Sequence, residues 1–198
     1  MNYDCDHGLF LALNFDGGVM LDRVMLTISG MAMWIPLYAL ILWLVYRRAG
    51  WRNVILFVVC LGAALALADL VAGVFKHVGL LKHLWTDFPP RLRPMFTPEL
   101  EGLVHFPPEA VAGRYGTVSS HAAIIVALTL LSSSVIRRRW FTWLMIGCAL
   151  LICYSRIYLA KHFPIDLVLG TGVGLLTSGA MLFIYRLLDR RWLARFRP

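Results

Sequence analysis

The sequence contains few charged residues. Only 15% of its 198 residues are Asp, Glu, Lys or Arg, whereas about 25% is usual in soluble domains. Those charges cluster, and they leave long stretches with almost none. The chain is 60% hydrophobic, with a mean hydropathy of +0.72, and a soluble domain of this length can bury only part of so much apolar surface. The composition therefore predicts an integral membrane protein, with residues 1–198 forming one domain.

Three missing patterns exclude other classes of protein. The four cysteines include no Cys-x-x-Cys pair, so neither a zinc site nor a disulfide framework is expected. The net charge of +8 would suit nucleic acid, but no basic stripe with interleaved aromatic residues is present, and a nucleic-acid partner is not expected. No basic region precedes the short apolar segment at 8–15, which argues against a cleaved signal peptide. This segment is too short to cross a bilayer and is expected to lie in its interface.

Five hydrophobic runs are candidates for membrane-spanning helices. About 20 residues cross the hydrocarbon core of a bilayer as a helix, and the third and fourth runs are shorter than that. The sequence therefore predicts an all-α membrane protein, a bundle of five transmembrane helices. The runs are residues 25–45, 54–75, 122–136, 141–158 and 165–187.

The arginines indicate how this bundle is oriented. They gather in the first connection, in the third connection and after the last span, and five spans place these three regions on one side of the membrane. The positive-inside rule makes that side cytoplasmic. The amino terminus and the long connection at about 76–118 then lie at the outer, periplasmic face. The arginines concerned are Arg47, Arg48, Arg52, Arg137, Arg138, Arg139, Arg186, Arg190, Arg191, Arg195 and Arg197.

Within the long connection, apolar residues recur at helical spacing. Leu81, Leu84, Trp85 and Phe88 alternate with polar residues, which predicts a short amphipathic helix resting on the outer leaflet. Two roles are open for it: guiding a substrate toward a site, or packing as a loop helix with no part in substrate entry. Six prolines restrict the connection as a whole and argue against a flexible linker.

Polar residues meet at the outer ends of four predicted spans. Ser119 or Ser120 suits the N-cap of the third span and Pro164 suits the first turn of the fifth, so two helix N-termini face outward. Their free N–H groups, with lysine and arginine side chains beside them, would bind a multiply charged oxyanion such as phosphate. The candidate phosphate-binding residues are Lys76, Arg93, Ser119, Ser120 and Arg156.

His162 and Asp166 form a candidate catalytic pair. They are four residues apart at a helix start, so the Asp166 carboxylate can accept one imidazole N–H and leave the other nitrogen free to attack. Cationic surroundings keep His162 neutral, and His121 from another helix can protonate the leaving oxygen. The chemistry predicted is phosphoryl transfer through a phosphohistidine. A metal site among the histidines is a weaker interpretation, because their spacing fits no usual ligand pattern and the nearby cations repel a metal ion.

One family motif is met in full and a second in part. The pattern SRxxxxxHxxxD is matched by Ser155, Arg156, His162 and Asp166. The pattern PSGH is matched by "VSSH" at 118–121, in which the first serine and the histidine keep their places. In these motifs the sequence resembles the type 2 phosphatidic acid phosphatase family of membrane lipid phosphatases. The segments "EGLVH" and "GRYGTVSSHAA" are similar to a bacterial branch of that family.

The remaining motif of that family, KxxxxxxRP, is incomplete. Arg93 and the proline after it match the end of the motif, but Thr86 stands where the lysine is expected. Lys76 and Lys82 are the two candidates for that lysine, and residues 77–90 form an inserted loop that would alter the choice of substrate.

The resemblance, which covers about residues 60–175, implies a lipid phosphatase of the bacterial inner membrane that uses neither metal nor cofactor. It implies that His162 is the nucleophile, that Asp166 orients it and that His121 is the general acid. The expected substrates are outer-leaflet lipid phosphates or diphosphates, with undecaprenyl diphosphate, phosphatidylglycerol phosphate, phosphatidic acid and lipid A 1-phosphate as candidates. A lipid-to-lipid phosphotransferase and a non-catalytic anion carrier remain alternatives, and no oligomeric state is predicted.

Overall fold

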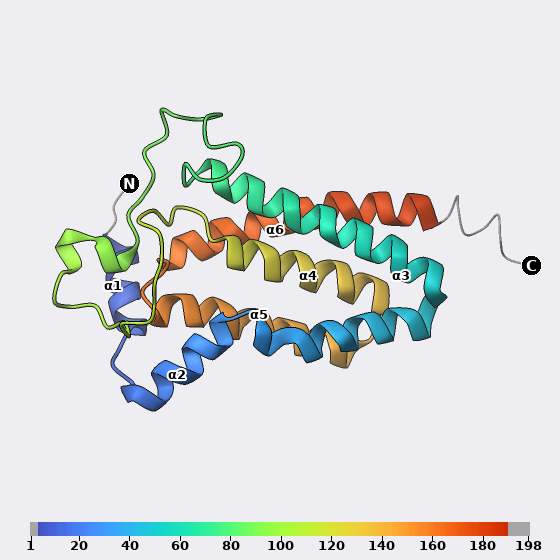
Figure 1. Cartoon of the computed structure of the whole chain (residues 1–198), viewed down its shortest axis with the longest axis horizontal. Helices are drawn as coiled ribbons and strands as arrows, with labels where there is room; N and C mark the ends of the chain where they lie inside the picture. The colour runs from blue at the N-terminus through green and yellow to red at the C-terminus, as the bar shows by residue number, and fades with distance from the viewer. Residues whose placement is uncertain (1–3, 190–198) are drawn as a thin grey trace, which may run out of the picture.

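The fold is helical throughout the part of the chain that the structure describes. This computed structural model describes residues 4–189, and within that range it contains six α-helices, three short 3₁₀ helices and no strand (Figure 1). The α-helices are α1 (Asp4–Leu13), α2 (Gly18–Ser29), α3 (Ile35–Val74), α4 (Ser120–Ile136), α5 (Arg139–Tyr158) and α6 (Pro164–Leu188). The 3₁₀ helices are η1 (Ala32–Trp34), η2 (Pro94–Phe96) and η3 (Pro98–Leu100).

Helix α3 consists of two segments joined by a sharp bend. At the bend, Gly50 has φ = 76° and ψ = 177°, a conformation that strains any residue with a Cβ atom. Residues 35–49 and 51–74 run in opposite directions on either side of it (Figure 1). The two segments therefore correspond to the first two hydrophobic runs of the sequence.

The first of these segments begins later than the sequence suggested. The hydrophobic run starts at residue 25, but residues 25–29 belong to α2, which ends at Ser29. The Trp34 indole then donates a hydrogen bond to the carbonyl of Ile28 (2.8 Å), and Pro36 stands in the first turn of α3. Proline is pre-shaped for a helix start but cannot continue a preceding helix. For this reason the run is divided between two helices.

Helices α4 and α6 cross at very short distance. A Cβ atom on Gly170 would lie 2.4 Å from the carbonyl oxygen of Ser119, and one on Gly174 would lie 2.4 Å from that of Ala123. Contacts of this kind are typical of membrane helices that pack through small residues. The close crossing places the first turn of α6 directly against the N-terminus of α4.

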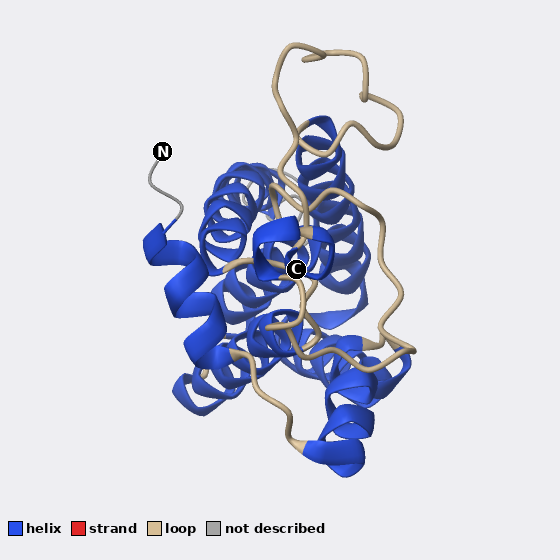
Figure 2. Ribbon diagram, turned by 90° about the vertical axis from the view of Figure 1, so that its left-hand side faces the viewer, coloured by secondary structure: helices blue, strands red, loops and turns tan. Residues whose placement is uncertain are grey.

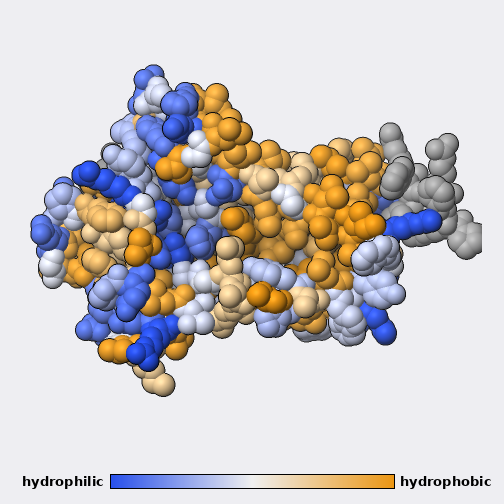
Figure 3. All heavy atoms as spheres, in the orientation of Figure 1, coloured by the Kyte–Doolittle hydropathy of each residue, from blue (hydrophilic) through white to orange (hydrophobic). Residues whose placement is uncertain are grey.

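The surface of the bundle is mostly apolar. Within residues 4–189, three segments are long and apolar enough to cross a membrane, and α4 is apolar but shorter. On the face that Figure 3 shows, hydrophobic side chains cover much of the bundle, while hydrophilic ones gather at the end that carries α1 and the long connection. The three segments are Ala32–Val74, Arg139–Tyr158 and Pro164–Leu188.

The bundle has two different ends. One carries α1, the long connection between α3 and α4, and the turn between α5 and α6 (Figures 1 and 2). The opposite end carries the α3 bend, the α4–α5 turn and the end of α6. The arginine-rich connections lie at this second end, as the span order predicted. Of the arginines named above, those at 190–197 lie outside the described residues.

The amphipathic helix expected in the long connection does not form. Residues 81–88 are a series of turns, with single hydrogen bonds from Leu84 N to Leu81 O and from Phe88 N to Trp85 O. Two prolines follow immediately and leave too few residues to extend a helical nucleus. The Trp85 and Phe88 rings instead pack on Phe75 at the end of α3, each 5.5 Å from it between ring centroids.

Helix α1 covers the end of the bundle where α6 begins. It is ten residues long, and its Phe10 side chain is fully buried with the ring edge-on to Phe163. The expectation that the segment at 8–15 does not span a membrane agrees with this position across the helix ends (Figure 2).

Candidate active site

Two helix N-termini and one C-terminus meet beneath the long connection. Ser119 caps α4 by accepting a hydrogen bond from Ala122 N (3.3 Å), and its own N–H donates to the carbonyl of Asp166 (3.0 Å). Asp166 in turn accepts a hydrogen bond from Phe163 N at the start of α6 (3.0 Å). The capping hydrogen bonds of α4 and α6 are therefore part of one network, and α5 ends beside it.

His162 lies in this network with its tautomer fixed by its neighbours. Its Nδ1 lies 2.9 Å from the carbonyl oxygen of Gly116 and 3.4 Å from Asp166 Oδ2, and its Nε2 lies 3.1 Å from Arg93 Nη1. A carbonyl can only accept and a guanidinium can only donate a hydrogen bond. Nδ1 therefore carries the proton, and Nε2 presents a lone pair toward Arg93.

Arg93 is held by the backbone on both sides of the imidazole. Its Nε donates to the carbonyl of Gly113 and its Nη1 to that of Lys161, each at 2.6 Å. Gly116 lies against it, since a Cβ atom there would be 2.9 Å from Arg93 Cγ and 3.4 Å from His162 Nδ1. The guanidinium is thus positioned by the connection as well as by the α5–α6 turn.

The positive charges around His162 are mostly buried. His162 itself is only 2% exposed, and its pKa is held well below the usual value by burial and then by Arg93, Arg156 and Lys76. Burial, followed by the charge of Arg93, also lowers the pKa of Lys76 to about 8. Burial lowers that of Lys161 to about 8 as well, with Arg156 as the next cause. At neutral pH the His162 imidazole is therefore uncharged, although positively charged side chains surround it. We call this group of cations, Lys76, Arg93 and Arg156, the cationic cup.

The predicted phosphate-binding residues occupy this cup. Lys76 Nζ donates a hydrogen bond to Ser120 Oγ (2.7 Å) at the start of α4, whereas Lys82 lies exposed in the turns of the connection. Arg156 donates to the hydroxyl of Ser29, and its buried Nε has no hydrogen-bond partner among the described residues. Of the two candidates for the motif lysine, the structure brings Lys76 to the site.

The two other motif residues differ in their position. His121 lies in the first turn of α4, close enough for its charge to contribute to the low pKa of His162. Ser155 instead donates its hydroxyl proton to the carbonyl of Ile152 within α5 (2.7 Å) and is fully buried. This serine of the third motif therefore stabilises the end of its own helix.

Two further residues belong to the site: Arg91, which the sequence places at the same membrane face without a role, and Asp6. Arg91 Nη1 lies 2.5 Å from Asp6 Oδ2 and 3.7 Å from Asp166 Oδ1, and its guanidinium stacks 3.7 Å from the centre of the Phe163 ring. Alternation of Arg91 with Arg93 in "PPRLRP" was a signal for the first of them. Nothing in the sequence pattern marks Asp6, because it lies in a different helix near the amino terminus.

The site suits an anion better than a cation. No group of three or more metal-ligating side chains gathers within residues 4–189, and the groups facing His162 are mainly cationic. An uncharged imidazole nitrogen with a lone pair, next to guanidinium and ammonium groups, can attack a phosphoryl group whose oxygens those cations bind.

The family is decided by a match that covers most of the second segment of α3 and all of α4, α5 and α6. The PAP2 superfamily model matches residues 57–192, more than two thirds of the chain. The chain belongs to the PAP2 superfamily. The resemblance to type 2 phosphatidic acid phosphatases is thereby confirmed, and this PAP2 protein is an enzyme, a membrane lipid phosphatase that hydrolyses phosphoric monoesters.

Two curated relatives extend over most of the chain. A lipid A 4'-phosphatase from Porphyromonas gingivalis is 25% identical over 195 residues, which are 98% of this chain and 79% of that protein. A lipid A 4'-phosphatase from Bacteroides thetaiotaomicron is 30% identical over 175 residues, or 86% of this chain and 72% of that protein.

A solved structure has the same fold. The PAP2-type phosphatidylglycerolphosphate phosphatase from Bacillus subtilis superposes with a TM-score of 0.60 at 21% identity, covering 100% of this chain and 90% of that one. The all-α membrane fold predicted from the sequence is thus confirmed for this PAP2 protein.

Proposed function

We propose that this enzyme removes the 4'-phosphate of lipid A, or of a closely similar phosphorylated glycolipid, at the outer face of the bacterial inner membrane. Support for the substrate comes from two relatives with this activity, each aligned over most of its length. Support for the orientation comes from the arginine-rich connections at the opposite end of the bundle. We further propose that residues 1–198 act as one catalytic domain, with the connection at about 76–118 forming the cover of the site.

One observation carries the proposed mechanism: His162 directs an unprotonated Nε2 into a cup of cations. In the first step Nε2 attacks phosphorus, an N–P bond forms, and the P–O bond to the lipid breaks. The lipid oxygen takes a proton from His121. Binding of a phosphate dianion offsets the positive charge around His121 and so favours the protonated, acidic form that this step needs.

In the second step water attacks the phosphohistidine. His121, now neutral, takes the proton of that water, the N–P bond breaks, and inorganic phosphate leaves. The carbonyl of Gly116 accepts the Nδ1 proton of His162, and Asp166 Oδ2, 3.4 Å from Nδ1, stabilises the positive charge that develops on the ring. The phosphoryl oxygens are bound by Lys76, Arg93, Ser119, Ser120 and Arg156, which include donors at the N-terminus of α4.

The test is phosphate release by the purified full chain from a lipid A carrying phosphates at both the 1 and 4' positions, in detergent with a chelator present. Mass spectrometry of the product is expected to show loss of the 4'-phosphate. Loss of the 1-phosphate alone would overturn the substrate assignment. Transfer of the phosphoryl group to a second lipid, without inorganic phosphate, would favour the phosphotransferase.

The mechanism is tested by rapid quenching with labelled substrate. An acid-labile, alkali-stable phosphoenzyme is expected in the unaltered chain and in His83→Asn, the same substitution at an exposed histidine of the connection. It is expected to be absent from His162→Asn, together with turnover. Turnover that persists in His162→Asn would exclude His162 as the nucleophile.

A further inference from the structure

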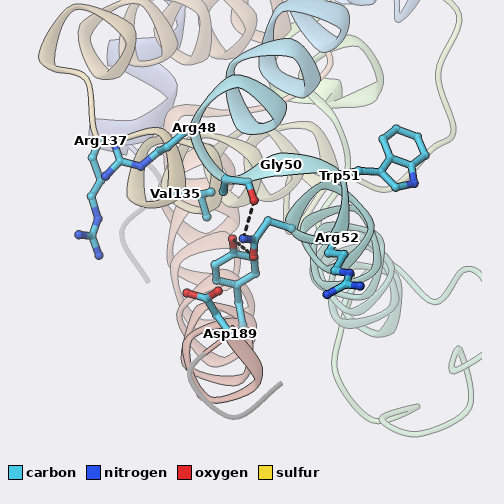
Figure 4. Close-up of a pocket in the computed structure, with 10 residues that line it drawn as sticks. Arg48, Gly50, Trp51, Arg52, Val135, Arg137 and Asp189 are labelled. Carbon is cyan, nitrogen blue, oxygen red and sulfur yellow. Dashed lines mark hydrogen bonds between the residues drawn. The ribbon is translucent and has the colours of Figure 1, made fainter. Parts of the chain in front are cut away.

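A second polar pocket lies at the opposite end of the bundle from the candidate active site. It has a volume of about 680 Å³ and opens between the bend of α3 and the last turns of α4 and α6 (Figure 4). Among the described residues, three arginines and one aspartate line it, and together they carry a net positive charge. These charged residues are Arg48, Arg52, Arg137 and Asp189.

Two of the arginines are positioned by the C-terminus of α4. Arg48 Nη1 donates to the carbonyl of Ile136 (2.9 Å), and Arg137 Nε donates to that of Ser134 (3.4 Å). A guanidinium has five N–H donors, and these bonds use one donor of each arginine among the described residues. Most of the donors of Arg48 and Arg137 are thus available to a ligand in the pocket.

The floor of the pocket consists of neutral polar groups. Tyr185 of α6 donates its hydroxyl proton to Asn53 Oδ1 (3.3 Å), and Asn53 Nδ2 donates to the carbonyl of Ala49 just before the bend (2.9 Å) (Figure 4). These bonds join α6 to both segments of α3. A ligand here would therefore contact the bend and the end of α6 together.

An apolar groove begins at the same bend. It has a volume of about 500 Å³, and Trp51 lines both the groove and the polar pocket. Several of its side chains are more than half exposed, among them Trp43, Trp51, Ile55 and Val59. The groove is lined by Leu42, Trp43, Tyr46, Trp51, Val54, Ile55, Val58 and Val59. A polar, cationic pocket thus continues into an apolar groove on the membrane-facing surface of α3.

We propose that the pocket and the groove together bind one acidic glycerophospholipid from the leaflet opposite the candidate active site. Arg48 and Arg137 bind the phosphodiester oxygens, which suit the fork of a guanidinium. Asp189 and Asn53 accept hydrogen bonds from hydroxyl groups of the headgroup, and an acyl chain lies along the groove beyond Trp51. A choline headgroup is disfavoured, because its ammonium group would lie among the arginines and offers no hydroxyl donor.

Positive charge alone, without a pocket, would bind acidic lipids more weakly and with less preference for one of them. Arginines near a membrane surface attract acidic lipids without any pocket, by about 1 kcal/mol each. Arg138 and Arg139 represent that case, since they are exposed at the same end but do not line the pocket. Two properties distinguish a binding site from attraction by surface charge. Lipid binding at a site depends on the arginines that line the pocket, and the site prefers a lipid to a free anion.

The experiment is native mass spectrometry of the purified full chain in mixed micelles containing equal amounts of phosphatidylglycerol and phosphatidylcholine. One phosphatidylglycerol is expected to remain bound through detergent removal, in preference to phosphatidylcholine by about tenfold or more. Equal retention of both lipids in the unaltered chain would overturn the proposal. If inorganic phosphate stabilised the chain against unfolding as strongly as phosphatidylglycerol does, the pocket would be a site for free anions. That result would also overturn the proposal.

Matched double variants then locate the bound lipid. Arg48→Gln with Arg137→Gln is expected to lose at least about tenfold in phosphatidylglycerol retention, whereas Arg138→Gln with Arg139→Gln keeps it despite the same change in net charge. If both double variants lost phosphatidylglycerol retention equally, surface charge alone would explain the binding, and the proposed site would be wrong. Phosphatase activity, whose candidate residues lie at the other end, serves as the measure of folding for both variants. Trp51→Ser, a single change where pocket and groove meet, is an independent check and is also expected to weaken retention.

Discussion

Arg91 and Asp6 are 85 residues apart in the sequence, and their side chains meet at 2.5 Å. The other carboxylate oxygen of Asp6 accepts a hydrogen bond from Ile165 N in the first turn of α6 (3.1 Å). Arg91 in turn lies between Asp6 and Asp166, 3.7 Å from Asp166 Oδ1. Helix α1 is therefore connected through one arginine to the carboxylate that holds the proposed nucleophile.

The first prediction concerns Asp6→Asn. With its strongest partner neutralised, Arg91 should move toward Asp166 and draw that carboxylate away from His162. We expect kcat to fall by about tenfold, the lower range found when groups that orient a catalytic ligand are lost, with KM little changed because the phosphate-binding cations stay in place. Steady-state kinetics on a phosphorylated lipid measures both constants.

Asp16→Asn is the control for this change. Asp16 carries the same charge in the segment that follows α1, but it is 73% exposed and lies next to Gly18 N and His105. We expect it to keep kcat within about twofold, because the position is exposed and the asparagine Oδ1 can still accept the hydrogen bond from Gly18 N. An equal loss of kcat in both variants would contradict a specific role for the Asp6–Arg91 pair.

A second prediction uses the closest approach of the backbone to the site. In Gly116→Ala the new methyl group would lie 2.9 Å from Arg93 Cγ and 3.4 Å from His162 Nδ1. Since a misplacement of about 1 Å can cost about 10²-fold, displacement of either group by a fraction of an ångström should lower kcat/KM by about tenfold. Gly113→Ala is the matched control, because it lies in the same segment and nothing is within 4 Å of its added Cβ atom. Comparable activity in the two variants would show that the site tolerates such a displacement.

The sequence allowed prediction of the site better than of the segments around it. The residues of the third motif are close in the chain and on two successive helix ends, so their spacing determined that His162 and Asp166 would meet. The contact of Lys76 with Ser120 depended on how α3 ends against α4, and the motif spacing left Lys82 as a possible substitute. Asp6 reaches the site only through tertiary packing of α1, for which a single sequence carries no signal.

The long connection shows the converse case, in which local pattern was overridden. Apolar residues at 81–88 have helical spacing, yet the segment forms turns because flanking prolines limit its length and Phe75 offers a surface for its aromatic rings. Helical periodicity states which side chains share a face, but not whether the segment is long enough for a helix to persist.

A third prediction concerns stability. In Gly174→Ala the added Cβ atom would lie 2.4 Å from the backbone carbonyl of Ala123, and no flexible side chain can move to relieve the contact. We expect α4 and α6 to separate, with a loss of about 1–3 kcal/mol typical of overpacked cores. Thermal unfolding in detergent measures it. Gly172→Ala, with nothing within 4 Å of its added Cβ atom, should be neutral or slightly stabilising, because alanine favours helix by about 1 kcal/mol over glycine.

The last prediction concerns pH. Burial and Arg93 lower the pKa of Lys76 from 10.5 to about 8, so in the free enzyme this lysine loses its positive charge as the pH rises through about 8. A phosphate monoester is almost entirely dianionic by pH 8, since its second pKa is about 6. A decline of kcat/KM on the alkaline side is therefore caused by titration of a group on the enzyme and not of the substrate. We expect kcat/KM to fall above about pH 8, as phosphate binding loses one of its cations.

Replacement of lysine by arginine identifies the group responsible for this decline. Arginine stays protonated over the accessible range, so Lys76→Arg should move the alkaline decline upward by at least about one pH unit even if its bulk lowers the maximal rate. Lys161 has the same lowered pKa of about 8, but it contributes its backbone carbonyl to Arg93. Lys161→Arg should therefore leave the decline near pH 8. A decline that moves in Lys161→Arg and not in Lys76→Arg would reverse the assignment and make Lys161 the cation that binds phosphate.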